Sequence, residues 1–196
     1  SFDRNYIKPF QVMLTSLVLN NPQERFHIWL LHSGILQSDL DALAEYCGAQ
    51  GAALTPVLVE PSVFKAAPIS KRYPQEMYYR LLAPVLLPDS VKRILYLDPD
   101  ILVINPVRPL WEVELNGHAF AAAPHSVVPD MVNDVNRLRL GSDSAYFNTG
   151  VILMDLSAAR ALVKPEDIFH YVQEHAAELL LPDQYVFNCL YGSYTL

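Results

Sequence analysis

The chain has 196 residues, of which 52% are apolar and 18% charged, a composition that excludes an intrinsically disordered protein. Its 14 basic and 21 acidic residues give a formal net charge of −7 with no basic run, which argues against non-specific binding of nucleic acid. Two cysteines exclude a disulfide scaffold or a cysteine-rich zinc module, and no apolar run reaches the roughly 18 residues that a membrane span needs.

The first part of the chain predicts helices and strands in alternation. The predicted elements are a helix within residues 7–21, a strand over 26–32, a helix over 39–47 and a strand over 54–60. The first strand is a nearly continuous apolar run, which is typical of a buried parallel strand. We expect Ser38 to cap the second helix and Gly48 to close it.

The rest of the chain continues this alternation. Its predicted elements are a helix over residues 77–87, strands over 93–98, 119–124 and 151–156, and helices over 165–181 and 183–192. The pattern predicts an α/β fold with a mostly parallel sheet flanked by helices. Because no linker or repeat interrupts it, we expect one domain over residues 1–196. The chain opens without a start Met or signal peptide and closes on what reads as a strand start, so we expect it to be truncated at both ends.

The most informative local motif is Asp98-Pro99-Asp100, which follows the apolar strand over residues 93–98. Residues two apart in an extended chain point the same way, so both carboxylates can face one site at the carboxyl end of a strand. Two hard oxygen donors suit Mg²⁺ or Mn²⁺, and such a metal can bridge a diphosphate. An ordinary Asp-Pro turn is the alternative interpretation.

Polar residues also precede two later elements. Asn148 and Thr149, with a glycine after them, come just ahead of the predicted strand over residues 151–156, where a plain turn is the alternative. Asp183 can cap the last helix, but capping does not explain Gln184. Arg80 is a cation among apolar helical residues, which by itself indicates a snorkelling or paired arginine.

Taken together, these segments resemble glycosyltransferase family 8, the retaining group that includes bacterial lipopolysaccharide galactosyl- and glucosyltransferases and glycogenin. The resemblance covers nearly the whole chain and runs in the family's order through SFDRNYIKPFQVMLTSLVLNN, MYYRLLAPVLLP, RILYLDPDILVINPVRPLW, YFNTGVILMDL and LLLPDQYVFNCLYG. It implies a Rossmann-like nucleotide-binding sheet of the GT-A type.

The resemblance also implies roles for matching residues. The implied donor-binding residues are Asp3, Asn5 and Tyr6 for the uridine, Arg80 for the sugar and diphosphate, Asp98 near the ribose, and Asn148 and Thr149 for the sugar. Asp98 and Asp100 match the family's pair of ligands for Mn²⁺ or Mg²⁺. Asp183 matches a sugar-binding carboxylate, and Gln184 matches the residue on the β face of the anomeric carbon. We therefore expect Arg80 to contact the donor and not to form a structural salt bridge.

The chain departs from the family pattern in several places. The strand before Ser1, the C-terminal histidine that supplies a third metal ligand and the lysine after it are absent. Tyr185 replaces an aspartate that often follows the glutamine, and His125 stands where some relatives carry an acidic residue near the acceptor.

The implied function is metal-dependent transfer of a galactose or glucose from a UDP-sugar to a saccharide or glycolipid acceptor, with retention. Because Gln184 is an amide and a poor nucleophile, we favour a front-face reaction, with a double displacement through Asp183 as the alternative. A mean hydropathy of +0.15 is high for a free-standing soluble domain, which indicates apolar surface covered by a partner, a membrane or missing sequence. We expect a cytoplasmic enzyme, with peripheral association at the inner face of the membrane as one option. A nucleotide-sugar-binding module without turnover and a haloacid-dehalogenase-type phosphotransferase are the competing hypotheses.

Overall fold

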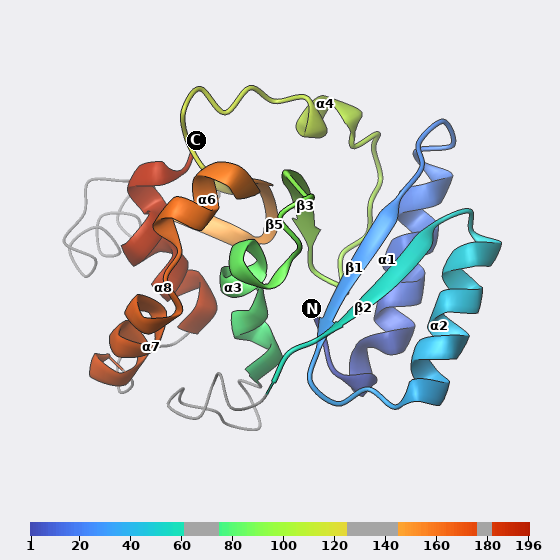
Figure 1. The fold of residues 1–196 in the computed structure, drawn as a ribbon. Coiled ribbons are helices and arrows are strands. Elements are labelled where there is room, and N and C mark those ends of the chain that lie inside the picture. The colour runs from blue at the N-terminus through green and yellow to red at the C-terminus, as the bar shows by residue number, and fades with distance from the viewer. Residues whose placement is uncertain (61–74, 125–144, 176–181) are drawn as a thin grey trace. The chain divides into compact units, whose positions relative to one another are not determined.

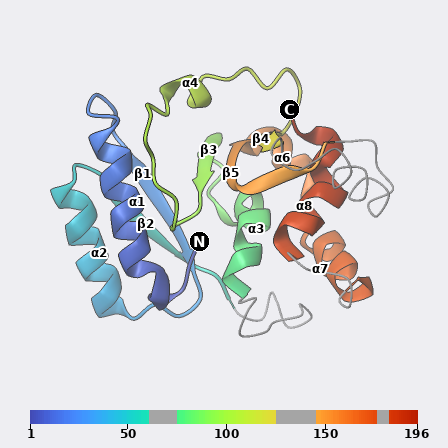
Figure 2. The ribbon, with the colours of Figure 1, turned by 180° about the vertical axis from the view of Figure 1, so that it is seen from behind.

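The computed structural model describes residues 1–60, 75–124, 145–175 and 182–196, which form two compact units. Unit 1 comprises Ser1–Lys65 and Leu97–Val113, and unit 2 comprises Ala66–Tyr96 and Glu114–Leu196. Figures 1 and 2 show the ribbon from opposite sides. Each unit is therefore assembled from two separate stretches of chain.

Unit 1 contains a two-stranded parallel sheet covered by helices. Its elements are η1 (Arg4–Tyr6), α1 (Ile7–Leu19), β1 (His27–His32), α2 (Gln37–Ala49), β2 (Ala53–Leu58) and α4 (Arg108–Trp111). β1 and β2 pair in parallel from His27 opposite Ala53 to His32 opposite Leu58. Because parallel neighbours need a crossover connection, α2 lies between them in the sequence.

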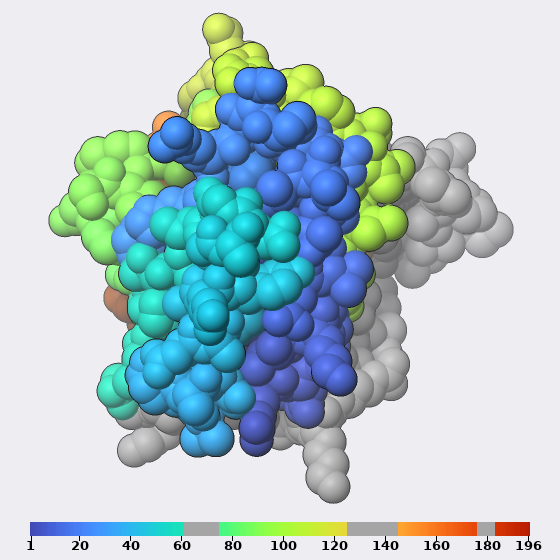
Figure 3. All heavy atoms as spheres, turned by 90° about the vertical axis from the view of Figure 1, so that its right-hand side faces the viewer, coloured from blue at the N-terminus to red at the C-terminus, as the bar shows by residue number. Residues whose placement is uncertain are grey.

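The core of unit 1 forms between its helices and its sheet. α1 buries Phe10, Met13, Leu14 and Leu17, a spacing that places these side chains on one helical face. They pack in one apolar cluster with residues of α2, β1 and β2. The ribbon views place α1 and α2 on the same face of the two strands, and Figure 3 shows their atoms side by side, dark blue and light blue.

Unit 2 contains a three-stranded sheet with helices around it. Its elements are η3 (Gln75–Tyr78), α3 (Tyr79–Leu86), β3 (Arg93–Leu97), β4 (Phe120–Pro124), β5 (Phe147–Asp155), α6 (Leu156–Leu162), α7 (Pro165–Glu174), α8 (Pro182–Tyr191) and η4 (Gly192–Tyr194). The strand order is β3-β5-β4, with β4 antiparallel to β5. β3 ends where the chain enters unit 1 again.

The end of α3 is held by an arginine of α6. The last carbonyls of a helix have no partner within the helix. Arg160 donates to the carbonyl oxygens of Pro84 at 2.9 Å, Leu87 at 3.2 Å, Pro88 at 2.9 Å and Val91 at 3.1 Å. A cation at this end also interacts favourably with the helix dipole. Arg160 thereby ties α3 and the loop after it to α6.

The observed elements confirm the α/β class and correct several local predictions. Ser38 does not cap α2, because the helix begins at Gln37 with Leu36 as its N-cap and no capping side-chain bond. β5 begins at Phe147, so Asn148 and Thr149 lie within the strand and not ahead of it. The pairing of β4 with β5 is antiparallel, whereas the β1–β2 pair is parallel as predicted.

The end of the chain departs in part from its prediction. Residues 192–194 form the short helix η4, where we expected the strand to begin, and the chain reaches β4 at its last two residues: Thr195 bridges to Phe120, and Leu196 bonds to the backbone of Phe120 and Ala122. Of the helices in the described residues, none combines the length and apolar character needed to cross a bilayer.

Candidate functional site

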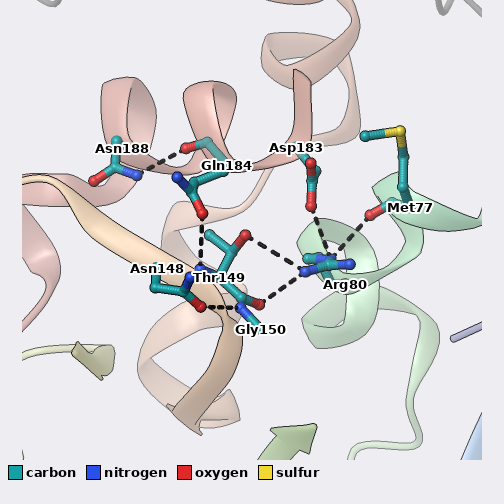
Figure 4. A network of polar contacts seen from close by, with 8 residues as sticks. All are labelled: Met77, Arg80, Asn148, Thr149, Gly150, Asp183, Gln184 and Asn188. Carbon is teal, nitrogen blue, oxygen red and sulfur yellow. Dashed lines mark hydrogen bonds and ion pairs between the residues drawn. The ribbon is translucent and has the colours of Figure 1, made fainter. Parts of the chain in front are cut away.

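Three elements of unit 2 bring predicted site residues into one buried polar network, shown in Figure 4. α3 carries Arg80 near its start, β5 carries Thr149, and α8 carries Asp183 and Gln184 in its first turn. Thr149, Asp183 and Gln184 are buried. The network joins residues that lie far apart in the sequence, so tertiary packing creates it.

Arg80 is the centre of this network. Its Nε lies 3.1 Å from Oδ2 of Asp183, and the two side chains are only 11% and 9% exposed. Its guanidinium also donates to the carbonyl oxygens of Met77 at 3.2 Å and Thr149 at 2.9 Å. It lies 4.9 Å from the ring centroid of Tyr96, within the range of a cation–π interaction. The expectation that Arg80 forms no structural salt bridge is wrong, because the carboxylate of Asp183 pairs with it.

The carboxylate of Asp183 raises the pKa of two tyrosine hydroxyls, those of Tyr78 and Tyr146. Burial raises the pKa of Tyr78, and the nearby Asp183 carboxylate raises it further. Burial also raises the pKa of Tyr146. A hydrogen bond with the Gln184 side chain lowers this pKa, and the charge of Asp183 raises it. Both hydroxyls therefore stay protonated at neutral pH and can serve as hydrogen-bond donors.

Gln184 and Thr149 meet through a hydrogen bond between α8 and β5. The side-chain Oε1 of Gln184 accepts from the backbone N of Thr149 at 3.4 Å, which is a long hydrogen bond. The hydroxyl of Thr149 lies 3.4 Å from Nη1 of Arg80. Gln184 thus contacts the strand directly and does more than occupy the helix start.

Asn148 lies next to this network but points away from the core. Phe147 and Thr149 are buried while Asn148 between them is exposed, as the alternation of a strand requires. The Asn148 side chain accepts from the backbone N of Gly150 at 2.8 Å. Its carboxamide is therefore held in a fixed orientation on the exposed side of β5.

The sequence analysis missed Asn188, a buried residue of α8. Its side chain bonds to both backbone groups of Phe147 and to the carbonyl of Gln184. The signal that could have found it is its position one helical turn after Gln184, because residues four apart lie on the same helix face.

The predicted metal ligands lie in unit 1. Asp98 directly follows β3 and is half-buried, Pro99 is buried, and Asp100 is exposed. Two carboxylates separated by one residue offer the hard oxygen donors that Mg²⁺ and Mn²⁺ prefer, so this donor set fits either cation. Within residues 1–60, 75–124, 145–175 and 182–196, no three or more His, Cys, Asp or Glu side chains gather into a larger metal-binding group.

The predicted uridine-binding residues lie at the start of unit 1. Asp3 is the N-cap of η1, where its carboxylate accepts from the backbone N of Asn5 at 2.8 Å and from the Asn5 side chain at 3.0 Å. Tyr6 is exposed. Phe2, next to Asp3, and Leu97, next to Asp98, pack in the same apolar cluster. The packing of Phe2 and Leu97 in that core holds the backbone next to Asp3 and next to Asp98 in place.

The remaining predicted site residue, His125, lies outside the described residues.

A comparison of the sequence with known families and proteins gives one consistent result. The model of glycosyl transferase family 8 matches residues 1–195. The chain is 28% identical over 192 residues to general stress protein A of Bacillus subtilis and 28% identical over 208 residues to lipopolysaccharide 1,2-glucosyltransferase of Escherichia coli. These matches cover 96% and 99% of this chain but 66% and 57% of the relatives, so the chain spans about three fifths of their length.

A solved structure has the same fold. The galactosyltransferase LgtC in complex with donor and acceptor sugar analogs superposes with a TM-score of 0.86 at 24% identity, covering 99% of this chain and 70% of that one. This likeness confirms the predicted GT-A type of α/β fold.

Proposed function

The chain belongs to glycosyltransferase family 8, and on that premise we propose that it transfers a glucose or galactose from a UDP-sugar to a saccharide or glycolipid acceptor with retention of configuration. The observation that carries the proposal is the buried network of Arg80, Thr149, Asp183 and Gln184 in unit 2. The hexosyltransferase names of a curated relative and of a solved structure support a hexose as the transferred group. Membership of glycosyltransferase family 8 argues against the haloacid-dehalogenase-type phosphotransferase hypothesis.

The residues of unit 2 are suited to bind a polar donor. Arg80 would contact the sugar and the diphosphate, since a guanidinium offers several donors in a rigid plane. The exposed Asn148 side chain and the Asp183 carboxylate would bind sugar hydroxyls. Because Arg80 and Asp183 already hold each other, both side chains would meet the donor without first losing much rotamer freedom.

Gln184 would lie near the anomeric carbon, where positive charge develops in the transition state. Its amide is a poor nucleophile, while its oxygen can stabilise an oxocarbenium-like state electrostatically. The ion pair with Arg80 makes Asp183 a weaker nucleophile as well. Both features favour a front-face reaction, in which the acceptor hydroxyl attacks on the face that UDP leaves, over a double displacement through Asp183.

In unit 1, Asp98 and Asp100 would hold Mn²⁺ or Mg²⁺, and Asp3, Asn5 and Tyr6 would bind the uridine. The bound metal would offset the negative charge that builds on the UDP leaving group. The exposed carboxylate of Asp100 is accessible for this role. The acceptor would bind outside these residues. We further propose a cytoplasmic location with peripheral attachment to the inner face of the membrane.

A screen of UDP-sugars tests the proposal in the full-length protein. UDP-glucose and UDP-galactose are incubated with Mn²⁺, and the release of UDP is measured with and without oligosaccharide acceptors. We expect release of UDP from one of the two donors by slow hydrolysis, and faster release when an acceptor is added because the sugar is then transferred to the acceptor hydroxyl. Calorimetric binding of UDP without turnover of any donor would instead identify a binding module, and absence of both would contradict the proposal.

A further inference from the structure

We infer that Asn188 is a positioning residue: its side chain sets the register of α8 against β5 and so fixes where Gln184 and Asp183 lie beside Thr149 and Arg80. The inference rests on the proposed function, because the step that Gln184 would serve is sugar transfer. Asn188 itself would touch neither the donor nor the acceptor.

The contacts of Asn188 tie one helix to one strand residue. Its Oδ1 accepts from the backbone N of Phe147 at 2.7 Å, and its Nδ2 donates to the carbonyl of Phe147 at 2.9 Å and to that of Gln184 at 2.8 Å. The side chain is only 3% exposed. A single carboxamide thus bonds both backbone groups of Phe147, as a paired residue on an antiparallel strand would.

β5 needs such partners because its pairing with β4 is irregular at this point. Ala122 lies opposite Ile152, but Pro124 lies opposite Phe147, so on the β4 side of β5 only Ala123 lies across from residues 148–151, while β3 is the neighbour on the other side. In this stretch side chains bond the strand backbone: Gln184 accepts from the N of Thr149, and Arg80 donates to its carbonyl. Phe147 and Thr149 are two residues apart, so their backbone groups face the same strand edge.

The spacing of the helix matches the spacing of the strand. Asn188 lies four residues after Gln184, a rise of about 6 Å along α8. Thr149 lies two residues after Phe147, a distance of about 6.6 Å along β5. The hydrogen bonds between Asn188 and Phe147 therefore bring Gln184 level with Thr149. A shift of the helix along the strand would break both contacts together.

Asn21 in unit 1 offers a matched control. It is also buried, at 4% exposure, its Oδ1 accepts from the backbone N of Val107 at 2.7 Å, and its Nδ2 donates to the carbonyl of Leu17, four residues earlier, at 2.8 Å. Replacing either asparagine by serine removes similar hydrogen bonds from a similarly buried place. Only Asn188 bonds to the strand that carries Thr149.

The test compares Asn188→Ser with Asn21→Ser in the full-length protein by two measurements. Hydrogen–deuterium exchange at the Phe147 and Thr149 amides should accelerate at least tenfold in Asn188→Ser. The amide of Asp155 at the other end of β5, which donates to the carbonyl of Ala119 at 2.9 Å, should keep its protection. The kcat for Mn²⁺-dependent hydrolysis of UDP-glucose or UDP-galactose should fall at least tenfold with a KM within threefold of wild type. Asn21→Ser should lower the melting temperature but keep the wild-type kcat.

Unchanged exchange at Thr149, or an equal loss of kcat in Asn21→Ser, would overturn the inference. If Asn188→Ser does not fold, Asn188→Asp decides, since it keeps the acceptor for the Phe147 amide and loses the donor to its carbonyl. If the wild-type protein turns over neither donor, the proposed function fails, while the exchange measurement still decides whether Asn188 sets the register.

Discussion

The guanidinium of Arg80 and the carboxylate of Asp183 form a buried ion pair whose Nε–Oδ2 distance is 3.1 Å. Removing one member of such a pair leaves an uncompensated buried charge, whereas the pair itself contributes little net stability over apolar residues. The two residues thus depend on each other for folding and, in the proposed reaction, for binding the donor. Single substitutions at either position will report on both properties at once.

We expect Arg80→Lys to lower the free energy of unfolding by about 1–3 kcal/mol and to raise KM for the UDP-sugar. A lysine ammonium cannot reproduce the simultaneous bonds to Asp183, Met77 and Thr149. Urea unfolding and steady-state kinetics measure the two effects. As a control, Arg108→Lys changes a pair with Glu24 whose arginine is 57% exposed, and should leave both quantities nearly unchanged. A destabilised variant with a normal KM would make Arg80 purely structural.

We expect Gln184→Ala to lower kcat by roughly ten- to a thousand-fold, the range of one electrostatic contact in a transition state. KM for the UDP-sugar should change little, because an interaction made only in the transition state affects kcat. The measurement is initial-rate kinetics on the full-length protein. An unaltered kcat with a lower melting temperature would show that Gln184 only holds the backbone of Thr149. A covalent sugar adduct trapped on Asp183 would support the double displacement.

We expect Asp98→Asn and Asp100→Asn each to weaken binding of UDP in the presence of Mn²⁺ by at least about tenfold, or 1.4 kcal/mol. Each change keeps the shape of the side chain and removes one of two adjacent negative charges. Titration calorimetry measures the affinity. Asp155→Asn is the matched control, because Asp155 also lies at the end of a strand but caps α6. Wild-type UDP affinity in both test variants would exclude these carboxylates as the metal ligands.

Arg160→Ala should destabilise the protein by about 1–3 kcal/mol, since four carbonyl oxygens lose a charged donor. Asp89, which lies 3.6 Å from Arg160, is 97% exposed, and Asp89→Ala should change the free energy of unfolding by less than about 0.5 kcal/mol. Urea unfolding of both variants tests this difference. Equal losses would show that the ion pair, and not the carbonyl contacts, holds the end of α3.

His32 should make the folded state sensitive to acid. Burial lowers its pKa below the ordinary 6.5, and within the described residues its Nδ1 has no hydrogen-bond partner. As the pH falls below about 6.5, the unfolded chain binds a proton that the folded chain does not, so the free energy of unfolding decreases. His32→Phe should flatten this decrease between pH 6.5 and 5.5 in urea unfolding experiments. Parallel curves for variant and wild type would contradict the role of His32.

Local sequence patterns predicted those elements whose apolar residues repeat with a single clear period. α1 and β1 are examples, because a period near 3.6 and a continuous apolar run are distinct signals. α6 was missed although Asp155 caps it by accepting from the backbone N of Ser157 and Ala158, since the apolar strand before it masked the change of period. The start of β5 was missed because Asn148 and Gly150 are typical of turns.

The candidate site was predictable as a set of residues but not as a set of contacts. Its members were found through adjacent positions, such as Asp183 with Gln184, and through the family resemblance. The ion pair of Asp183 with Arg80 joins helices that are far apart in the sequence, so no local period reveals it. Asn188 was missed because its position one helical turn after Gln184 places it on the same helix face but does not show which strand its side chain bonds.

Each unit is made of two separate stretches of the chain, and this limits which segments can be exchanged with a related protein in a chimera. A chimera that exchanges only residues 1–65 would leave the segment Leu97–Val113 of the original protein against a foreign α1, where Ser16 and Asn20 bond the backbone of Val103. Exchange of both stretches keeps these partners together. Segments exchanged between related proteins should therefore include both stretches of a unit, and not one continuous piece of sequence.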